Sequence, residues 1–376
     1  MAETEDISSY DLDFNFTLME IEEEPPPYVL VFFEVLLIVF GIPGNMLVLY
    51  VVLRNGAMKT VTNLYLVNLS IADLVFLVLV VPSHIMLLLS HPMHKYICKA
   101  YQYVLRVTLA SSILTLVSMA ADRYYGVMYP MKCRIHRTLR SSVVILACIW
   151  LIACTTQVPV IIYNTSLELP DGSWTICVEL WPHAGAKAYY NISYTLTFYV
   201  APLVVIGVCY GRMAKLLWHS FSPQYGDTEV VATQMFMRRK IAVMILIVVI
   251  CFAACWFTYH FHDVLVALDY LPYLSFNQIR IISRAGRFLG AMNSALNPFL
   301  YAFLSENFRR CFYRAFPCVS KLSIGSSSFV QRDPDEKTTY SRRSVVGRYN
   351  TTSRATRLTS IRSVRHESGS PKPQQI

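Results

Sequence analysis

Long apolar stretches alternate with shorter polar ones along most of the chain. Each apolar stretch is longer than the roughly 20 residues with which an α-helix crosses the hydrocarbon core of a bilayer. We therefore predict membrane-spanning helices over seven segments, at residues 28–54, 60–89, 96–129, 140–163, 190–218, 239–268 and 279–303.

Together the segments predict an all-α membrane protein in which residues 28–304 form a seven-transmembrane helix bundle. Residues 1–27 are acidic and polar, and we expect them to be disordered and extracellular. This stretch lacks the basic start and apolar centre of a signal peptide, so we expect the first apolar helix to act as the insertion signal. Residues 319–376 are rich in Ser, Thr and Arg and predict a disordered cytoplasmic tail.

A short amphipathic segment follows the last apolar stretch. Phe308, Phe312 and Phe316 recur every four residues among arginines, so they share one face of a helix. We predict an eighth helix over residues 305–318 that lies on the inner membrane surface and contacts lipid. Cys318 is a candidate for palmitoylation there, with a free thiol as the alternative.

Composition agrees with a membrane protein, because 55% of the 376 residues are hydrophobic and only 15% are charged. A soluble domain usually has about 25% charged residues. The net charge of +9 raises the question of nucleic-acid binding. The basic residues, however, lie in loops and tail beside apolar segments, so membrane topology explains them better and no nucleic-acid partner is expected.

The distribution of basic residues also predicts orientation. They concentrate after the first, third, fifth and seventh segments, whereas the opposite loops contain acids such as Glu168. The positive-inside rule then places the N-terminus outside and the C-terminus in the cytosol of a multi-pass plasma-membrane protein. The glycosylation sequons at Asn15 and Asn164 fall outside, while the one at Asn350 falls inside and should be unused.

Most of the ten cysteines lie within apolar segments or face the cytosol. Only Cys98 and Cys177 fall on the predicted extracellular side. Two cysteines without another partner in an oxidising compartment predict a disulfide bond.

Ionisable groups inside apolar segments are costly unless they are paired or hydrated. Asp73 lies in the middle of the second segment, and Ser112, Asn293 and Asn297 supply neutral oxygens at comparable depth. One carboxylate with neutral oxygens suits a small hard cation such as sodium, or a proton. A structural acid satisfied by neighbouring amides is the alternative.

At the inner end of the third segment, Asp122 and Arg123 are either an interfacial salt bridge or a pair that holds the arginine in one conformational state. Prolines interrupt several helices. Pro298 lies within the seventh segment, where Asn297 is close enough to satisfy the carbonyl that proline leaves free. The sequence also predicts disruptions of helices two, four and five, at Pro82, Pro159 and Pro202.

These motifs occur in order, one set per helix, and resemble the signature of the rhodopsin-like (class A) G-protein-coupled receptors over roughly residues 28–316. The motifs are Gly44-Asn45, Leu69-Ser-Ile-Ala-Asp73, Asp122-Arg123-Tyr124, Trp150, Pro202 with Tyr210, Phe252 with Cys255-Trp256, and Asn297-Pro-Phe-Leu-Tyr301. Three further stretches are similar to the galanin, kisspeptin, allatostatin and somatostatin receptor group, namely Met58–Asn63, Cys177–Pro182 and Asn293–Phe308.

The resemblance implies a receptor rather than an enzyme, with heterotrimeric G proteins, receptor kinases and arrestin as partners. The kinases and arrestin would act on the Ser/Thr-rich tail from Ser320 onward. Apart from a sodium ion at Asp73, the resemblance implies no cofactor. It assigns sodium binding to Asp73, Ser112, Asn293 and Asn297, a packing switch to Ile113, Pro202, Phe252 and Trp256, and G-protein coupling to Asp122, Arg123, Tyr124, Tyr210 and Tyr301.

Two positions depart from the family pattern. Thr258 stands where the family usually has proline, and its hydroxyl can bond back to the carbonyl four residues earlier and bend the helix mildly. We therefore expect a straighter helix six. Arg238 stands where some receptors place an acid facing Arg123, so that lock is absent and a raised basal activity becomes conceivable.

Several ligand classes are excluded. The seventh segment has no lysine for a retinal Schiff base, and no acid for an amine ligand lies between Cys98 and Asp122. The outer halves of the helices instead combine polar and aromatic side chains, which suits a neuropeptide. The predicted ligand-binding residues are Gln102, Leu105, Arg106, His260, Asp263, Arg284, Arg287 and Phe288.

Arg284 and Arg287 lie on neighbouring turns of one helix face and repel unless an acceptor sits between them. We expect Asp263 to supply one acceptor and the end of a peptide to supply another, bound by Arg287 and Arg106. Structural salt bridges, or a non-peptide acidic ligand bound by the same arginines, are the alternatives. A transporter is the competing class, but the sequence lacks the internal repeats and charge rings of transporters and channels.

Overall fold

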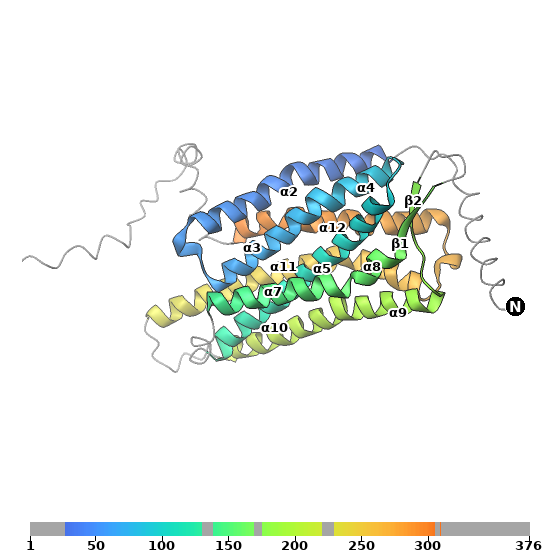
Figure 1. Ribbon diagram of the computed structural model, residues 1–376. Coiled ribbons are helices and arrows are strands. Elements are labelled where there is room, and N and C mark those ends of the chain that lie inside the picture. The colour runs from blue at the N-terminus through green and yellow to red at the C-terminus, as the bar shows by residue number, and fades with distance from the viewer. Residues whose placement is uncertain (1–26, 130–137, 169–174, 220–228, 305–308, 310–376) are drawn as a thin grey trace, which may run out of the picture. The chain divides into compact units, whose positions relative to one another are not determined.

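The computed structural model describes residues 27–129, 138–168, 175–219, 229–304 and 309. These residues form a bundle of long helices with one small hairpin (Figure 1). The helices are α2 (Tyr28–Arg54), α3 (Val61–Val75), α4 (Val81–Leu88), α5 (Lys95–Met128), α7 (Leu139–Thr156), α8 (Val158–Tyr163), α9 (Ala184–Thr195), α10 (Ala201–His219), α11 (Glu229–Ala267) and α12 (Phe276–Leu304), with short turns η1 (Gly56–Met58), η2 (Phe76–Val80), η3 (Leu196–Val200) and η4 (Leu271–Tyr273).

The helices confirm the predicted seven-transmembrane bundle. Within the described residues, six helical spans are long and apolar enough to cross a membrane, with mean hydropathies from 1.7 to 2.8. The seventh, α12, is more polar because Arg280, Arg284 and Arg287 lie in its first half. It nevertheless packs along both α2 and α11, so it completes the bundle.

Two helices begin earlier than the apolar pattern predicted. The fifth predicted segment began at residue 190, whereas α9 begins at Ala184. The sixth began at residue 239, whereas α11 begins at Glu229. Hydrophobicity marks the part of a helix that lies in lipid, and a helix can continue into water, where its backbone is still bonded internally. The predicted eighth helix and the predicted disordered ends lie outside the described residues, apart from residues 27 and 309.

Prolines disrupt the second, fourth and fifth spans as predicted. The π-helical turn η2 precedes Pro82, and a second π-helical turn, η3, precedes Pro202. Between α7 and α8 the helix is interrupted at Gln157, two residues before Pro159. Proline lacks a backbone N–H and its ring clashes with the preceding turn, so the chain adds a residue or breaks the helix beside it.

A hairpin lies at one end of the bundle (Figure 1). Strand β1 (Asn164–Glu168) pairs antiparallel with β2 (Thr175–Glu179), with Ser166 opposite Cys177. The predicted disulfide bond is present, since Cys177 is bonded to Cys98 near the start of α5, with 5.6 Å between their Cα atoms. This bond ties the loop between α8 and α9 to the third membrane span.

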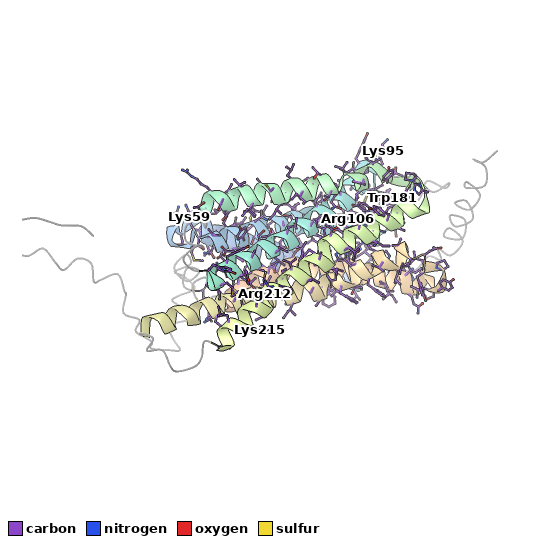
Figure 2. The ribbon with its side chains drawn as sticks, turned by 90° about the horizontal axis from the view of Figure 1, so that it is seen from below. Lys59, Lys95, Arg106, Trp181, Arg212 and Lys215 are labelled. Atoms are coloured by element: carbon purple, nitrogen blue, oxygen red, sulfur yellow. A yellow bond between two sulfur atoms is a disulfide. The ribbon has the colours of Figure 1, made fainter. Side chains whose placement is uncertain are left out.

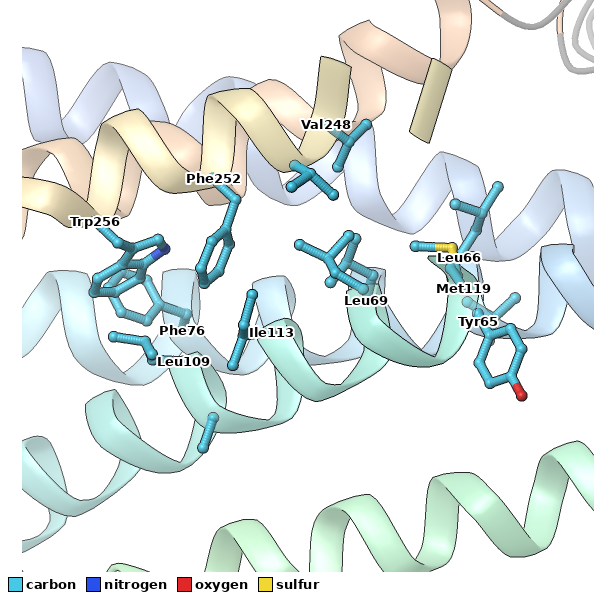
Figure 3. Close-up of a cluster of buried hydrophobic side chains, with 14 of the residues drawn as sticks. Tyr65, Leu66, Leu69, Phe76, Leu109, Ile113, Met119, Val248, Phe252 and Trp256 are labelled. Atoms are coloured by element: carbon cyan, nitrogen blue, oxygen red, sulfur yellow. The ribbon is translucent and has the colours of Figure 1, made fainter. Parts of the chain in front are cut away.

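The core centres on α5, which packs against α3, α7, α10 and α11. Figure 3 shows Leu109 and Ile113 of α5 facing Phe252 and Trp256 of α11. Polar bonds add to this packing. Asn68 of α3 donates to the Thr115 hydroxyl of α5 (2.9 Å) and accepts from the Trp150 indole of α7 (2.8 Å). The Asn68 side-chain amide therefore joins three helices. Its bond to Trp150 gives a structural role to the tryptophan of the sequence motif.

Helices α11 and α12 approach each other closely at two glycines of α12. A Cβ atom on Gly286 would lie 2.9 Å from the Tyr259 backbone, and one on Gly290 would lie 2.8 Å from the Trp256 ring. These positions need glycine because of close approach rather than unusual backbone angles.

We predict that Gly286→Ala weakens the α11–α12 contact by about 1–3 kcal/mol, because the added methyl meets backbone that cannot rotate away. The measurement is the melting temperature of the purified protein. Gly207→Ala is the matched control, because a Cβ there meets nothing within 4 Å. Equal melting temperatures for both variants would show that the α11–α12 contact accommodates the added methyl group without loss of stability.

Candidate functional site

The half of the bundle nearest the β1–β2 hairpin, the outer half of the sequence prediction, contains a buried ion pair between two helices (Figure 2). Arg106 of α5 and Asp263 of α11 are only 3% and 5% exposed, and Arg106 Nη1 lies 3.3 Å from Asp263 Oδ2. Two charges inside a membrane protein are tolerated when each compensates the other. The pair therefore fixes α11 against α5 at this depth.

Aromatic rings enclose the Arg106 guanidinium. Its central carbon lies 4.7 Å from the ring centre of Tyr194, 5.4 Å from Tyr190 and 5.9 Å from Tyr259. Its Nη2 also donates to the Asn191 side chain at 3.4 Å. A planar, weakly hydrated guanidinium suits such a cage, because it stacks on rings while its edge makes hydrogen bonds.

The aromatic cage continues to the loop between α8 and α9. The Trp181 ring lies 4.6 Å from Tyr163 and 5.0 Å from Tyr190, and its indole donates to Glu179 at 3.0 Å. Glu179 also pairs with Lys187 at 3.5 Å. Figure 2 shows Arg106 and Trp181 toward one end of the bundle and Lys59, Arg212 and Lys215 toward the other.

The other predicted ligand-binding residues occupy the same outer half but differ in exposure. Leu105 and His260 are buried, and His260 stacks on Tyr199 at 4.5 Å and lies 3.3 Å from the Thr195 hydroxyl. The remaining four are half-buried, namely Gln102, Arg284, Arg287 and Phe288.

One expectation about this region needs correction. Asp263 was expected to lie as an acceptor between Arg284 and Arg287, but its ion pairs are with Arg106 and, at 3.9 Å, His262. Within the described residues, Arg287 makes no hydrogen bond or ion pair. The reason is geometric, since Arg106 and Asp263 lie on helices that face each other across the bundle.

A second polar cluster was missed from the sequence. Glu34 of α2 and His84 of α4 are both buried, with Glu34 Oε1 2.7 Å from His84 Nδ1. Arg287 is close enough to His84 and Tyr101 to interact with both electrostatically. The signal was present in the sequence, because Glu34 is an acid within an apolar segment.

In the middle of the bundle, Asp73 is buried and accepts a hydrogen bond from Asn297 Nδ2 at 2.8 Å. Ser294, which was not predicted, is also buried and lies close enough to Asp73 to interact with its carboxylate. The predicted residues Ser112 and Asn293 are buried as well. The Asn297 side-chain oxygen is also buried and accepts no hydrogen bond from the part of the chain that the structure describes.

Beside this polar cluster lies the predicted packing switch. Trp256 contacts the Phe76 ring at 5.7 Å and the Phe252 ring at 6.1 Å, both on the side toward α5. Ile113 is fully buried in the same cluster (Figure 3). Pro202, the fourth predicted switch residue, follows the π-helical turn η3. Phe76 and Gly290 were not predicted, although both touch the Trp256 ring.

At the opposite end of α5, Arg123 Nη2 donates to Asp122 Oδ2 at 2.8 Å and to the Thr62 hydroxyl of α3. The hydroxyls of Tyr210 and Tyr301 are buried, and the Tyr124 ring meets the rings of Tyr125 and Tyr129 edge to face, at 5.6 and 6.4 Å between ring centres. Asp122 and Arg123 are therefore paired, as both the salt-bridge and the conformational-switch interpretations predicted, and Thr62 is an additional partner. The side chain of Arg238 lies outside the described residues.

The predicted modification sites are only partly visible. Asn164 is 1% exposed, and its Nδ2 donates to the Val160 carbonyl at 3.0 Å. A glycan on that nitrogen would require the hydrogen bond to open. Asn15 and Cys318 lie outside the described residues.

Comparison with known proteins identifies this arrangement. Residues 44–301 match the model of the 7 transmembrane receptor (rhodopsin family), a range that includes the motifs from Gly44 to Tyr301. The chain belongs to this family and is a G-protein-coupled receptor, not an enzyme.

Individual relatives show which receptors of this family the chain is similar to. The chain is 34% identical to the allatostatin-A receptor of Bombyx mori over 80% of this chain and 82% of that protein. It is 32% identical to galanin receptor 2a of Danio rerio, covering 74% and 75%, and 31% identical to the KiSS-1 receptor of Mus musculus, covering 75% and 73%. The predicted receptor group is thereby confirmed for allatostatin, galanin and kisspeptin receptors.

We predict that Asp263→Asn destabilises the receptor by about 3–5 kcal/mol, because it leaves the Arg106 charge buried without a counter-charge. Thermal melting of the purified protein measures this loss. The double variant Arg106→Met with Asp263→Leu should recover most of it, because an apolar pair removes both charges. If the single variant melted like the wild type, the ion pair would contribute nothing to the fold.

Proposed function

We propose that an extracellular peptide activates this receptor and that the receptor signals through heterotrimeric G proteins. The observation that carries the proposal is the similarity, over about three quarters of the chain, to receptors named for allatostatin-A, galanin and KiSS-1. The mixed aromatic and charged outer half supports it, since peptides present both kinds of group. A non-peptide acidic ligand is less well supported, because these relatives are named for peptides.

The arginines of the outer half supply the ligand contacts in this proposal. The Arg106 charge is compensated by Asp263, whereas half-buried Arg287 makes no ion pair within the described residues. A carboxylate or carbonyl at the end of a peptide would bind Arg287 first. Arg106 contributes its Nε, a buried donor that has no acceptor among the described residues. Arginine suits this role because its planar fork can bind an oxygen pair.

Binding would act on the receptor through the Arg106–Asp263 pair. A ligand that competes for Arg106 weakens the link between α5 and α11, and α11 also contains Trp256. A ligand shifts the equilibrium only by its difference in affinity between the two conformations. The rearrangement would end at Arg123, whose bond to Asp122 would open to admit the G protein.

We also propose a sodium ion at Asp73. Asp73, Asn297 and Ser294 provide one carboxylate and neutral oxygens, the donor set that a small hard cation prefers. Ser112 and Asn293 are buried at the neighbouring positions that the family resemblance assigns to this site. The ion would neutralise Asp73 and favour the conformation in which these residues remain together.

The remaining partners follow from topology. We propose a plasma-membrane receptor with its N-terminus outside, and receptor kinases and arrestin acting on the Ser/Thr-rich tail. The end of the bundle with Lys59, Arg212 and Lys215 would then face the cytosol (Figure 2). Lipid contact by residues 305–318 and palmitoylation of Cys318 belong to the same proposal.

We predict that Arg287→Ala lowers agonist affinity about ten- to hundredfold, the effect of losing a charge-assisted hydrogen bond. Binding and potency are measured with a panel of allatostatin-A, galanin and KiSS-1 peptides at matched surface expression. Arg280→Ala is the control on the same helix, because that side chain is bonded to Asn277. If Arg287→Ala left affinity unchanged for a peptide that activates the wild type, the arginine would have only a structural role.

We predict that sodium weakens agonist binding to the wild type and that Asp73→Asn abolishes this dependence, because a sodium ion bound in one conformation shifts the population toward it. The measurement is agonist affinity in sodium chloride against choline chloride at equal ionic strength. Persisting sodium sensitivity in the variant would place the ion elsewhere.

A further inference from the structure

Tyr199 connects two helices through a bond that the family signature does not include. Its hydroxyl, in the π-helical turn η3, donates to the Ala253 carbonyl of α11 at 2.8 Å. Its ring also stacks on His260 of α11, with 4.5 Å between the ring centres. Both contacts lie within two turns of α11, on either side of Trp256. The Tyr199 side chain therefore binds the segment of α11 that contains the packing switch.

The Ala253 carbonyl matters because α11 has no proline. Helix α11 runs unbroken from Glu229 to Ala267, and Thr258 stands where the family usually has proline. A proline there would free the carbonyl of Ala254, which is four residues earlier and adjacent to Ala253, and create a hinge. Without proline, a helix bends mainly where another group enters its hydrogen-bond ladder. The Tyr199 hydroxyl is such a group, since it shares the Ala253 carbonyl with the helix.

The opposite side of α11 is held by contact rather than by a hydrogen bond. A Cβ on Gly286 of α12 would meet the Thr258–Tyr259 backbone, and one on Gly290 would meet Trp256. The segment from Ala253 to His260 is therefore packed between α12 and η3. Movement of α11 away from η3 must break the Tyr199 bond.

The same residue is linked to the outer ion pair. The Tyr194 ring lies 4.7 Å from the Arg106 guanidinium and 5.6 Å from the His260 ring, which in turn stacks on Tyr199. A rearrangement at Arg106 thus reaches the Ala253 carbonyl through rings in contact. The structure with this bond is also the one in which Arg123 is paired with Asp122.

We propose that Tyr199 is a positioning residue for activation, whose hydrogen bond to the Ala253 carbonyl holds α11 in the arrangement in which Arg123 is paired. It takes the place of the missing proline as the point at which α11 is controlled. The proposal concerns the transmission of the signal, so it does not depend on which ligand binds.

The test is basal nucleotide exchange, without ligand, on purified heterotrimeric G proteins of each Gα class by the receptor in lipid nanodiscs. Tyr199→Phe removes the hydroxyl and keeps the ring on His260. Basal exchange per folded receptor should rise about two- to tenfold, the population shift that corresponds to one lost hydrogen bond. Tyr189→Phe is the matched control, because that ring is 78% exposed on the preceding helix, and it should leave exchange unchanged.

Rescue separates a positioning role from a general loss of packing. 4-Aminophenylalanine at position 199 keeps a donor on the ring and should return basal exchange to the wild-type level, whereas a packing defect would persist. It also serves if Tyr199→Phe yields too little folded receptor, since the donor-bearing variant should then fold and signal normally. Unchanged or lower basal exchange in folded Tyr199→Phe, or a rise that the amino analogue does not reverse, would overturn the proposal.

Discussion

The bilayer offers no hydrogen bonds, and this constraint governs every polar group inside the bundle. Each buried charge of the receptor must be compensated by a neighbour, and the neighbour usually belongs to another helix. Arg106 is paired with Asp263, Asp73 is bonded to Asn297, and Glu34 contacts His84. The polar residues that interrupt the apolar pattern are consequently the residues that join the helices, and a change in one pair must move at least two helices.

The joined helices do not contribute equally. Helix α5 packs against four spans, and the disulfide near its start also fixes the β1–β2 hairpin. Helix α11 packs along α12, but toward α5 and η3 it is held by polar contacts that can open, namely the Arg106–Asp263 pair and the Tyr199 bond. A fixed central helix beside one held by separable polar bonds allows a ligand at one end to change the surface at the other.

Much of this architecture could be predicted from the sequence. Apolar length located the spans, and topology left Cys98 and Cys177 as the extracellular pair. The contact between Asp73 and Asn297 was within reach because both lie at the same membrane depth. The partner of Asp263 was not, since periodicity places a residue on a helix face but does not say which face of the neighbouring helix it meets.

The hydrogen bond of Tyr199 to α11 could not be predicted from the sequence, for a related reason. An inserted residue in a π-helical turn rotates the side chains on one side of it by about 100° relative to the other side. A helical wheel drawn through η3 would therefore assign Tyr199 to the wrong face. The strands β1 and β2 were missed because each has only five residues and lies in a loop between spans. Glu34, by contrast, could have been predicted to have a buried partner, because an unpaired acid in an apolar span is energetically costly.

The polarity of α12 has a consequence for the biosynthesis of the receptor. Arginine near the centre of a helix costs roughly 2.5–3.5 kcal/mol on insertion from the translocon, and α12 has Arg284 and Arg287 in its outer half with Asn293 and Asn297 deeper. Such a helix enters lipid poorly by itself, yet α2 and α11 offer it a surface along its length. Helix α12 should therefore be stably retained only after the earlier spans have assembled. Quality control in the endoplasmic reticulum would then detect a defect anywhere in the bundle as a last helix that fails to stay in the membrane.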